Sequence, residues 1–331
     1  MTRASAFLGR AARQALNIVG LLATVVVLNF LLIQTAPGDP AQVIAGEMGG
    51  ASPEVLAQIR AQYGLDRSLP EQLLTYLGKV AQGDLGYSFY FNQPVTGLIL
   101  NRLPATLLLV VSALFVAVVV GGGLGALAAR KPNGALSRAV SVGSTAAHAA
   151  PVFWTGLMLL VLFSSLWPVL PVAGMDDPAA RHTGLAYVLD VLSHLVLPTV
   201  TLAIVYIAQY SRLMRASMID ALHADYVRTA RAKGLPERVV MGKHALRNAL
   251  IPLVTMVGMQ FGQMFAGAVL VETVFSWPGL GRLVFDSILR RDYPTLLGIL
   301  FFSALLVVLV NLLTDVIYRL IDPRIRTGRA A

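Results

Sequence analysis

The chain of 331 residues contains no cysteine and few charged residues. Without cysteine it can form no disulfide, no thiolate nucleophile and no cysteine-bearing metal site. Charged residues make up 13% of the sequence and hydrophobic residues 56%, whereas soluble domains carry roughly 25% charged residues. The scarcity of charge therefore argues against a single soluble core.

Sequence motifs for nucleotide binding and catalysis are also missing. The phosphate-binding pattern GxxxxGK[ST] does not occur, so a process driven by ATP would need another chain to bind the nucleotide. The five histidines lack HExxH spacing, and no GxSxG nucleophile elbow is present. We therefore expect no catalytic residue, no metal site and no cofactor bound by this chain.

Long apolar runs recur along the whole sequence. A helix that crosses the hydrocarbon layer of a membrane needs about 20 apolar residues. Water is absent from that layer, so the backbone must pair with itself and each run should be helical. Strand-like alternation is weak, which disfavours a barrel. The sequence predicts an all-α polytopic membrane protein with six transmembrane helices, at 16–33, 104–129, 139–166, 192–214, 249–275 and 296–320.

The first apolar run has two interpretations. Arg3, Arg10 and Arg13 precede it, as in a secretory signal peptide. The run is longer than the hydrophobic stretch of about 7 to 15 residues that is typical of signal peptides. Its length favours a retained transmembrane helix.

The net charge of +9 is unevenly distributed. Lysine and arginine mark the cytoplasmic side of membrane proteins. If the N-terminus is inside, most of the 26 basic residues fall in inner segments and most of the 17 acidic residues in outer ones. The basicity therefore indicates orientation, with both termini cytoplasmic, and not a surface for nucleic acid.

The outer segment 36–102 is the longest polar stretch of a chain that we treat as one membrane domain, 1–331. Ser52 can cap a helix that begins at Pro53, and a second helix with an apolar stripe is expected over 70–80. These helices either cover the outer mouth of the protein or also contact a substrate-delivering protein.

The inner segment 215–248 is polar but has a helical pattern. Asp225 suits the N-cap of a short helix, Gly234 can end it in a left-handed conformation, and Pro236 prevents its continuation. The small side chains of Ala230 and Ala232 would let another protein approach the backbone. On physical grounds this basic helix is either an anchor on anionic lipid or a docking element.

The stretch DYVRTARAKGLPERVVMGKHALRNALIP at 225–252 resembles the cytoplasmic signature loop of permeases in binding-protein-dependent ABC importers. It is similar to the dipeptide, oligopeptide and nickel branch of that family. Thr229 and Ala230 match the small pair of the signature, and Gly234 matches its glycine. Arg228 stands where many importers have an acidic residue, and Pro252 lies further from the glycine than in the general pattern. Both departures are similar to the peptide branch.

Other segments resemble the same branch, in the same order along the chain. They are APGDP (36–40), YGLDRSLPEQ (63–72), GDLGYS (83–88), LPATL (103–107), PVFWTG (151–156), HLVLPT (194–199), VETVFSWPGLGR (271–282) and DPRIR (322–326). Each string is weak alone, whereas the ordered set covers nearly the whole chain.

The resemblance implies a type I ABC-importer permease fold in the bacterial cytoplasmic (inner) membrane. It implies that the 215–248 segment docks a cytoplasmic ATPase, through Asp225, Tyr226, Arg228, Thr229, Ala230, Arg231, Lys233 and Gly234. The implied partners are a homologous second permease subunit, two ATPase subunits that bind ATP and Mg²⁺, and an extracytoplasmic solute-binding protein.

Small peptides are the substrate that the branch suggests first, and nickel chelates, glutathione or another small solute share the same architecture. A secondary transporter that works without ATP is the rival from a different class. It would need buried ionisable residues near mid-membrane, and this chain has almost none outside the span ends.

Three features inside the apolar runs carry further hypotheses. Gln260 and Gln263 lie three residues apart and could line a translocation path, or they could bond to neighbouring helices. Pro252 removes the helical partner of the Asn248 carbonyl and could serve as a hinge between the inner segment and the helix above it. The glycine cluster 121–125 has no following lysine and favours close helix packing.

Overall fold

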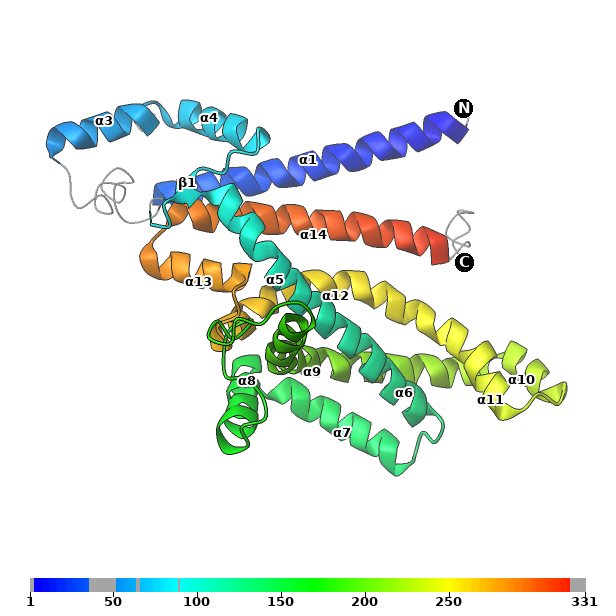
Figure 1. The fold of residues 1–331 in the computed structure, drawn as a ribbon. Helices are drawn as coiled ribbons and strands as arrows, with labels where there is room; N and C mark the ends of the chain where they lie inside the picture. Colours follow the sequence, from blue (N-terminus) through cyan, green and yellow to red (C-terminus); the bar gives the residue numbers. More distant parts are fainter. Residues whose placement is uncertain (1–2, 36–51, 64–65, 89, 322–331) are drawn as a thin grey trace. The chain divides into compact units, whose positions relative to one another are not determined.

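The computed structural model describes residues 3–35, 52–63, 66–88 and 90–321, and nearly all of its regular structure is helical (Figure 1). The chain divides into two compact units. One comprises Met1–Leu103 and Leu283–Leu309, and the other comprises Pro104–Arg282 and Val310–Ala331.

The first unit contains three complete helices, a short hairpin and parts of three more helices. The elements are α1 (Arg3–Thr35), α3 (Pro53–Tyr63), α4 (Leu69–Ala81), β1 (Tyr87–Ser88), β2 (Gln93–Pro94), α5 (Val95–Val116), α13 (Leu280–Arg290) and α14 (Tyr293–Ile321). The last three of these continue into the second unit. The two strands pair in antiparallel fashion.

The two helices that the sequence predicts within 36–102 are confirmed. The helix α3 begins at Pro53, and the Leu56 N–H donates to the Ser52 carbonyl at 3.0 Å. The helix α4 exceeds the predicted range of 70–80 by one residue at each end. Its third residue, Glu71, accepts a hydrogen bond from the Ser68 backbone N–H at 3.2 Å, which satisfies a donor that the helix itself leaves unpaired.

Buried polar contacts fix the first unit. The Asn29 side chain donates to the Leu297 carbonyl at 3.2 Å and joins α1 to α14. The Ser88 hydroxyl of the hairpin donates to the Asp292 carboxylate at 2.5 Å. Asp292 also accepts from the Thr295 backbone N–H at 3.3 Å, at the start of α14. These contacts connect the hairpin and two long helices within one unit.

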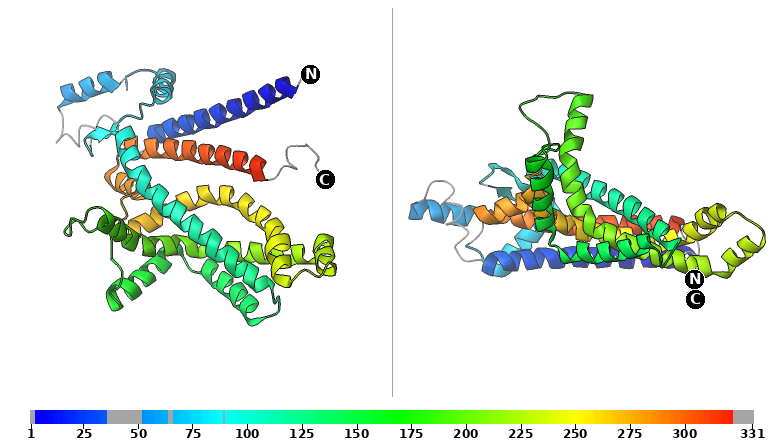
Figure 2. Two further views of the ribbon diagram at one scale, coloured as in Figure 1. Left: turned by 45° about the vertical axis from the view of Figure 1, so that its right-hand side comes forward. Right: turned by 90° about the horizontal axis from the view of Figure 1, so that it is seen from below.

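The second unit is built around α9. It contains η1 (Ala117–Gly121), α6 (Gly122–Ala129), α7 (Ala135–Ala149), α8 (Val152–Leu160), η2 (Val161–Leu166), α9 (Leu185–His223), α10 (Asp225–Ala232), α11 (Glu237–Val239), η3 (Val240–Ala245) and α12 (Leu246–Val274), where η marks π-helical segments. The helix α9 contacts α6, α7, α8 and α12 (Figures 1 and 2). It is therefore the central helix of this unit.

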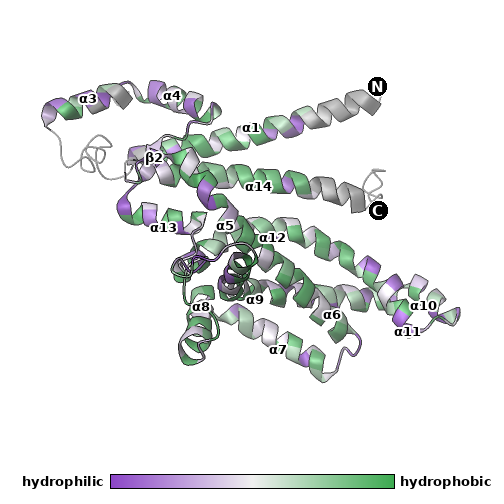
Figure 3. Cartoon of the chain, viewed as in Figure 1, coloured by the Kyte–Doolittle hydropathy of each residue, from purple (hydrophilic) through white to green (hydrophobic). Residues whose placement is uncertain are grey.

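Five described helices are long and apolar enough to cross a membrane, at Ala12–Leu32, Val95–Ala129, Leu185–His223, Glu237–Val274 and Tyr293–Thr314. A sixth span results if the bent pair Ala135–Ala149 and Val152–Leu166 is counted as one. Figure 3 shows the hydrophobic residues along these helices and hydrophilic ones gathered at α3 and α4 and around α10 and α11. The all-α polytopic fold predicted from the sequence is confirmed.

The third predicted span, 139–166, is not one straight helix. The pair α7 and α8 bends by 101° between Ala149 and Val152. Pro151 has no N–H to continue the helix, and its ring disfavours helical geometry in the residue before it. Ala150 is accordingly extended, with φ −86° and ψ 129°. The bend is thus a local consequence of the proline.

The glycine cluster packs closely against α9, as expected. A Cβ atom at Gly121 would lie 2.7 Å from the Ile207 carbonyl oxygen, and one at Gly125 would lie 2.7 Å from Met214 Cβ. Distances under 3.0 Å are essentially never observed for real Cβ atoms. Gly123 has open space around it. Two of the four glycines therefore form a seam between the η1–α6 segment and α9.

Candidate coupling loop and translocation path

The polar segment 215–248 is helical over most of its length. The helix α9 continues through it to His223, and α10 follows after one extended residue, Ala224, with φ −69° and ψ 149°. Ala224, and not Asp225, is therefore the N-cap of α10, because the chain needs its extended residue there to turn out of α9. Asp225 begins α10, where a carboxylate is favoured by the positive end of the helix dipole.

The end of α10 matches its expected geometry. Gly234 has φ +75°, the left-handed conformation that glycine adopts without strain. The Leu235 N–H donates to the Ala230 carbonyl at 3.4 Å, and the Gly234 N–H donates to the Arg231 carbonyl at 2.9 Å. These two bonds form a Schellman motif, which satisfies the last carbonyls of a helix. We refer to residues 225–234 as the candidate coupling loop.

The two faces of α10 have different surroundings. Val227 is fully buried and Ala230 is 4% exposed, because this side packs on η3 and the end of α9. The small residue Ala230 therefore faces its own chain, which corrects the expectation that it would admit a partner. The outward face consists of Asp225, Tyr226, Arg228, Thr229, Arg231 and Ala232, followed by Lys233.

Charged side chains of the loop form exposed ion pairs. Arg228 lies 3.3 Å from the Asp225 carboxylate. Arg231 binds Glu237 through two nitrogens, at 2.8 Å and 3.2 Å. The hydrogen bonds that Arg231 donates to the Glu237 carboxylate raise the pKa of Arg231 above its ordinary value. Exposed pairs of this kind contribute little to stability, and their charges remain accessible to another protein.

The candidate coupling loop is connected directly to a long helix. The π-helical segment η3 contacts α10, α11 and α12, and α12 follows it without a break. Pro252 lies inside α12, and α12 follows a curved path (Figure 2). A π-helical turn and a proline are two recognised causes of helix bending.

The two glutamines chosen as path residues lie in different environments. Gln260 is 5% exposed and donates to the Gln209 side chain of α9 at 2.6 Å. The Gln209 amide nitrogen lies 3.3 Å from His148 Nε2 of α7. Gln263 is exposed on α12. The structure thus places Gln260 in an interhelical polar chain and Gln263 on the outside of the described chain.

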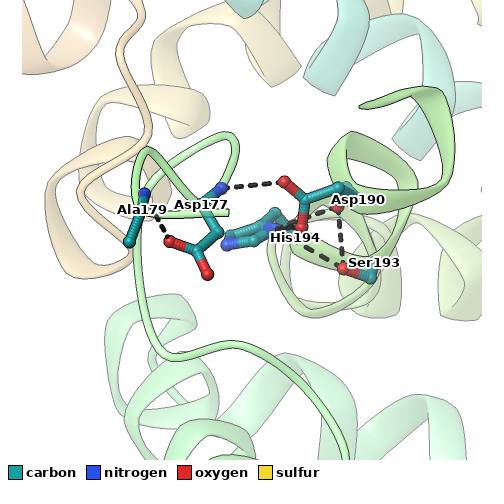
Figure 4. A network of polar contacts seen from close by, with 5 residues as sticks. All are labelled: Asp177, Ala179, Asp190, Ser193 and His194. Atoms are coloured by element: carbon teal, nitrogen blue, oxygen red, sulfur yellow. Dashed lines mark hydrogen bonds and ion pairs between the residues drawn. The ribbon is translucent and has the colours of Figure 1, made fainter. Parts of the chain in front are cut away.

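A second polar network lies at the start of α9 (Figure 4). The Asp177 N–H donates to the Asp190 carboxylate at 2.8 Å, and the Asp177 carboxylate accepts from the Ala179 N–H at 2.9 Å. His194 Nδ1 lies 2.9 Å from the Asp190 carbonyl, to which the Ser193 hydroxyl also donates at 2.7 Å. The network attaches the segment before α9 to the helix itself.

One buried acidic residue was not singled out from the sequence. Glu272, in the last turn of α12, has 0% of its surface exposed. Its carboxylate accepts hydrogen bonds from the Thr106 hydroxyl at 2.7 Å and from the Arg282 backbone N–H at 3.1 Å. The sequence alone could have pointed to Glu272, because an ionisable residue near an apolar run is rare and usually has a specific role.

The described chain thus combines several helices long enough to cross a membrane with a polar helical segment at the ends of α9 and α12. A chain in the structure of inward facing conformations of the MetNI methionine ABC transporter matches with a TM-score of 0.55 and 16% identity, covering 68% of this chain and 96% of that one. The fold is therefore the type I ABC-importer permease fold, as predicted.

Residues 121–327 match the family model described as Binding-protein-dependent transport system inner membrane component, and residues 6–110 match its N-terminal counterpart. The dipeptide transport system permease protein DppB of Escherichia coli K12 is 41% identical over 321 residues, covering 91% of this chain and 94% of the relative. The di/tripeptide transport system permease protein DppB of Pseudomonas aeruginosa is 41% identical, covering 92% and 95%. The chain belongs to this family of inner-membrane transport subunits, which confirms the resemblance.

Proposed function

We propose that this chain is the permease subunit of an ATP-driven importer that carries small peptides across the inner membrane. The similarity to dipeptide and di/tripeptide permeases over more than nine-tenths of the chain supports this substrate class. The family supports partnership with ATPase and binding-protein subunits. A homologous second permease would complete the path.

The observation that carries the proposal is the geometry of the candidate coupling loop. A short helix ended by a Schellman motif presents Tyr226, Arg228 and Thr229 outward, while Val227 and Ala230 attach it to the chain. Such a surface suits insertion into a groove of a cytoplasmic ATPase, where Arg228, Arg231 and Lys233 meet acidic groups. In this arrangement both termini lie in the cytoplasm, and ATP and Mg²⁺ bind to the ATPase.

Transport would proceed by alternating access. ATP binding draws the ATPase subunits together, and the coupling loops transmit that movement to the permease helices. Pro252 would serve as the hinge at the inner end of α12, and Gln260 and Gln263 would contribute polar groups to the path. The exposure of Gln263 and the buried Gln260 Oε1, which has no hydrogen-bond partner among the described residues, are compatible with this role.

The test is the ATPase activity and peptide uptake of the complex in proteoliposomes, with both permeases, the ATPases and the dipeptide-loaded binding protein. We expect loaded binding protein to stimulate hydrolysis in the wild type. Gly234→Val should lower that stimulation about tenfold, because a left-handed conformation costs a side chain about 1–2 kcal/mol and valine adopts it least readily.

The matched control is Gly83→Val on the outer side. Gly83 has φ +80° and, like Gly234, no neighbouring atom within 4 Å of an added Cβ. It imposes the same backbone strain away from the loop and should leave stimulation unchanged. Equal solute movement without any ATPase would contradict the proposal and favour an ion-coupled carrier. Stimulation by a nickel chelate or glutathione in place of peptides would redirect the substrate assignment.

A further inference from the structure

Glu272 lies in an environment where an ionised side chain is energetically unfavourable. It is fully buried at the outer end of α12, in a chain that crosses a membrane. A buried carboxylate loses its hydration and must recover that free energy from hydrogen-bond donors or opposite charges. The surroundings of Glu272 therefore indicate what the side chain does.

Two groups beside the carboxylate are hydrogen-bond donors. The Thr106 hydroxyl oxygen accepts from the Leu280 backbone N–H at 2.7 Å. Its single proton is consequently directed to Glu272, 2.7 Å away. The Arg282 backbone N–H provides a second donor. Leu280 and Arg282 belong to the first turn of α13, whose N–H groups have no partner inside the helix and whose dipole favours a negative charge.

The turn between α12 and α13 is shaped around this carboxylate. A Cβ atom added at Gly279 would collide with the Glu272 carboxylate, and one added at Gly281 would lie 3.0 Å from Glu272 Oε2. Trp277 in the same turn is fully buried, and its indole N–H donates to the Ala105 carbonyl at 2.8 Å. Two segments that are far apart in the sequence, 105–106 and 272–282, thus meet at one charge.

The helix α12 connects the candidate coupling loop with the residues around Glu272. At its inner end α12 is continuous with η3, on which the candidate coupling loop packs. At its outer end it terminates at the Glu272 cluster, defined as Ala105, Thr106, Glu272, Trp277, Leu280 and Arg282. A continuous helix of 29 residues spans about 43 Å at 1.5 Å per residue. Beyond Pro252 the helix contains no further proline, so a displacement that reaches this part of α12 is carried to its end at Glu272.

We propose that Glu272 is a positioning residue for transport. Its carboxylate fixes the turn 275–281 to both α12 and α5, so that a movement of α12 driven from the coupling loop also moves the outer turn. The inference rests on the proposed function, because it assigns Glu272 a part in coupling ATP hydrolysis to uptake. Loss of the cluster should lower peptide uptake without lowering ATP hydrolysis, and the complex should still assemble.

The experiment measures peptide taken up per ATP hydrolysed in the reconstituted complex. Thr106→Val keeps the side-chain volume and removes the hydroxyl, and Glu272→Gln removes the charge. Each should lower uptake per ATP about tenfold, because a hydrogen bond to a charged group is worth roughly one such factor or more. Thr106→Ser restores the hydroxyl and should restore the ratio.

Thr201→Val is the matched control. Thr201 and Thr106 are each 1% exposed, and the Thr201 hydroxyl donates to the Leu197 carbonyl of its own helix. This variant should keep the wild-type ratio. If Glu272→Gln fails to assemble, the two Thr106 variants decide.

A ratio for Thr106→Val equal to that of Thr201→Val would overturn the inference. A parallel loss of hydrolysis and uptake would also overturn it, since that result indicates a role in folding alone. A wild-type complex that takes up no peptide, or that needs no ATPase, would contradict the proposed function and remove the premise of the inference. The wild-type measurement therefore separates the two failures.

Discussion

In the candidate coupling loop, the side chains of Arg228 and Asp225 are 74% and 96% exposed, whereas Glu272 in the last turn of α12 is fully buried. The two exposed charges pair with each other in water. The buried carboxylate is enclosed by its own chain. The difference shows that charge has two uses here. Exposed pairs cost little and remain free for a partner, whereas a buried carboxylate is committed to holding elements of one chain together.

Two glycine substitutions test the difference between the buried and the exposed charges, and their expected effects are the largest. Gly279→Ala places a Cβ against the Glu272 carboxylate, which would have to move away from its hydrogen-bond donors. A buried charge that loses its partners costs about 3–5 kcal/mol of stability, and we expect a loss of that size. Gly234→Ala meets no neighbouring atom and should cost only about 1–2 kcal/mol of backbone strain. The yield and melting temperature of the purified chain would measure both. Equal losses would contradict the contrast between the buried and the exposed charges.

A substitution at Pro252 tests whether movement of the candidate coupling loop is transmitted along α12 to Glu272. Pro252→Ala restores an N–H inside α12 and should stiffen the helix, since proline costs about 3 kcal/mol in a helix interior. We expect a melting temperature at or above that of the wild type and a lower uptake of peptide per ATP. Ile251→Ala, at the exposed neighbouring position, controls for the loss of surface. Unchanged uptake and hydrolysis in Pro252→Ala would remove the hinge hypothesis.

The smallest expected effect belongs to the exposed pair. Arg228→Gln should leave the melting temperature nearly unchanged, because exposed ion pairs contribute little to stability. Binding of the ATPase subunits should weaken severalfold at low salt, and the difference should fade at high ionic strength, where exposed charges are screened. Lys79→Gln, on an exposed residue of α4, is the charge control. Weakening that persists at high salt would indicate lost packing contacts.

The spans and the short helix α10 could be predicted from the sequence because they depend on local patterns. Apolar runs locate membrane helices through their length alone, and Gly234 and Pro236 mark the end of α10 by backbone preferences that do not depend on neighbours. The positions where such helices begin and end were less accurate. The helix α9 reaches His223, because a helix continues past the apolar run when polar residues still favour it.

The parts that could not be predicted depend on contacts between distant residues. Spacing places Gln260 and Gln263 on nearby sides of one helix, but it does not say which side meets α9. Ala230 was expected to face a partner, and its burial follows from η3 packing on α10. The role of Glu272 requires Thr106, which lies 166 positions away. The residue pattern within α12 cannot identify a contact with so distant a residue as Thr106.

The glycine seam between the η1–α6 segment and α9 has a mechanical consequence. At Gly121 and Gly125 the two segments approach so closely that no Cβ fits between them. Close-packed backbones of this kind cannot turn about their own axes without collision. Any rotation during the transport cycle must therefore carry both segments together as one rigid piece. That piece supplies an internal frame of reference, against which the displacement of α12 can be recorded by spectroscopic labels in a chain free of cysteine.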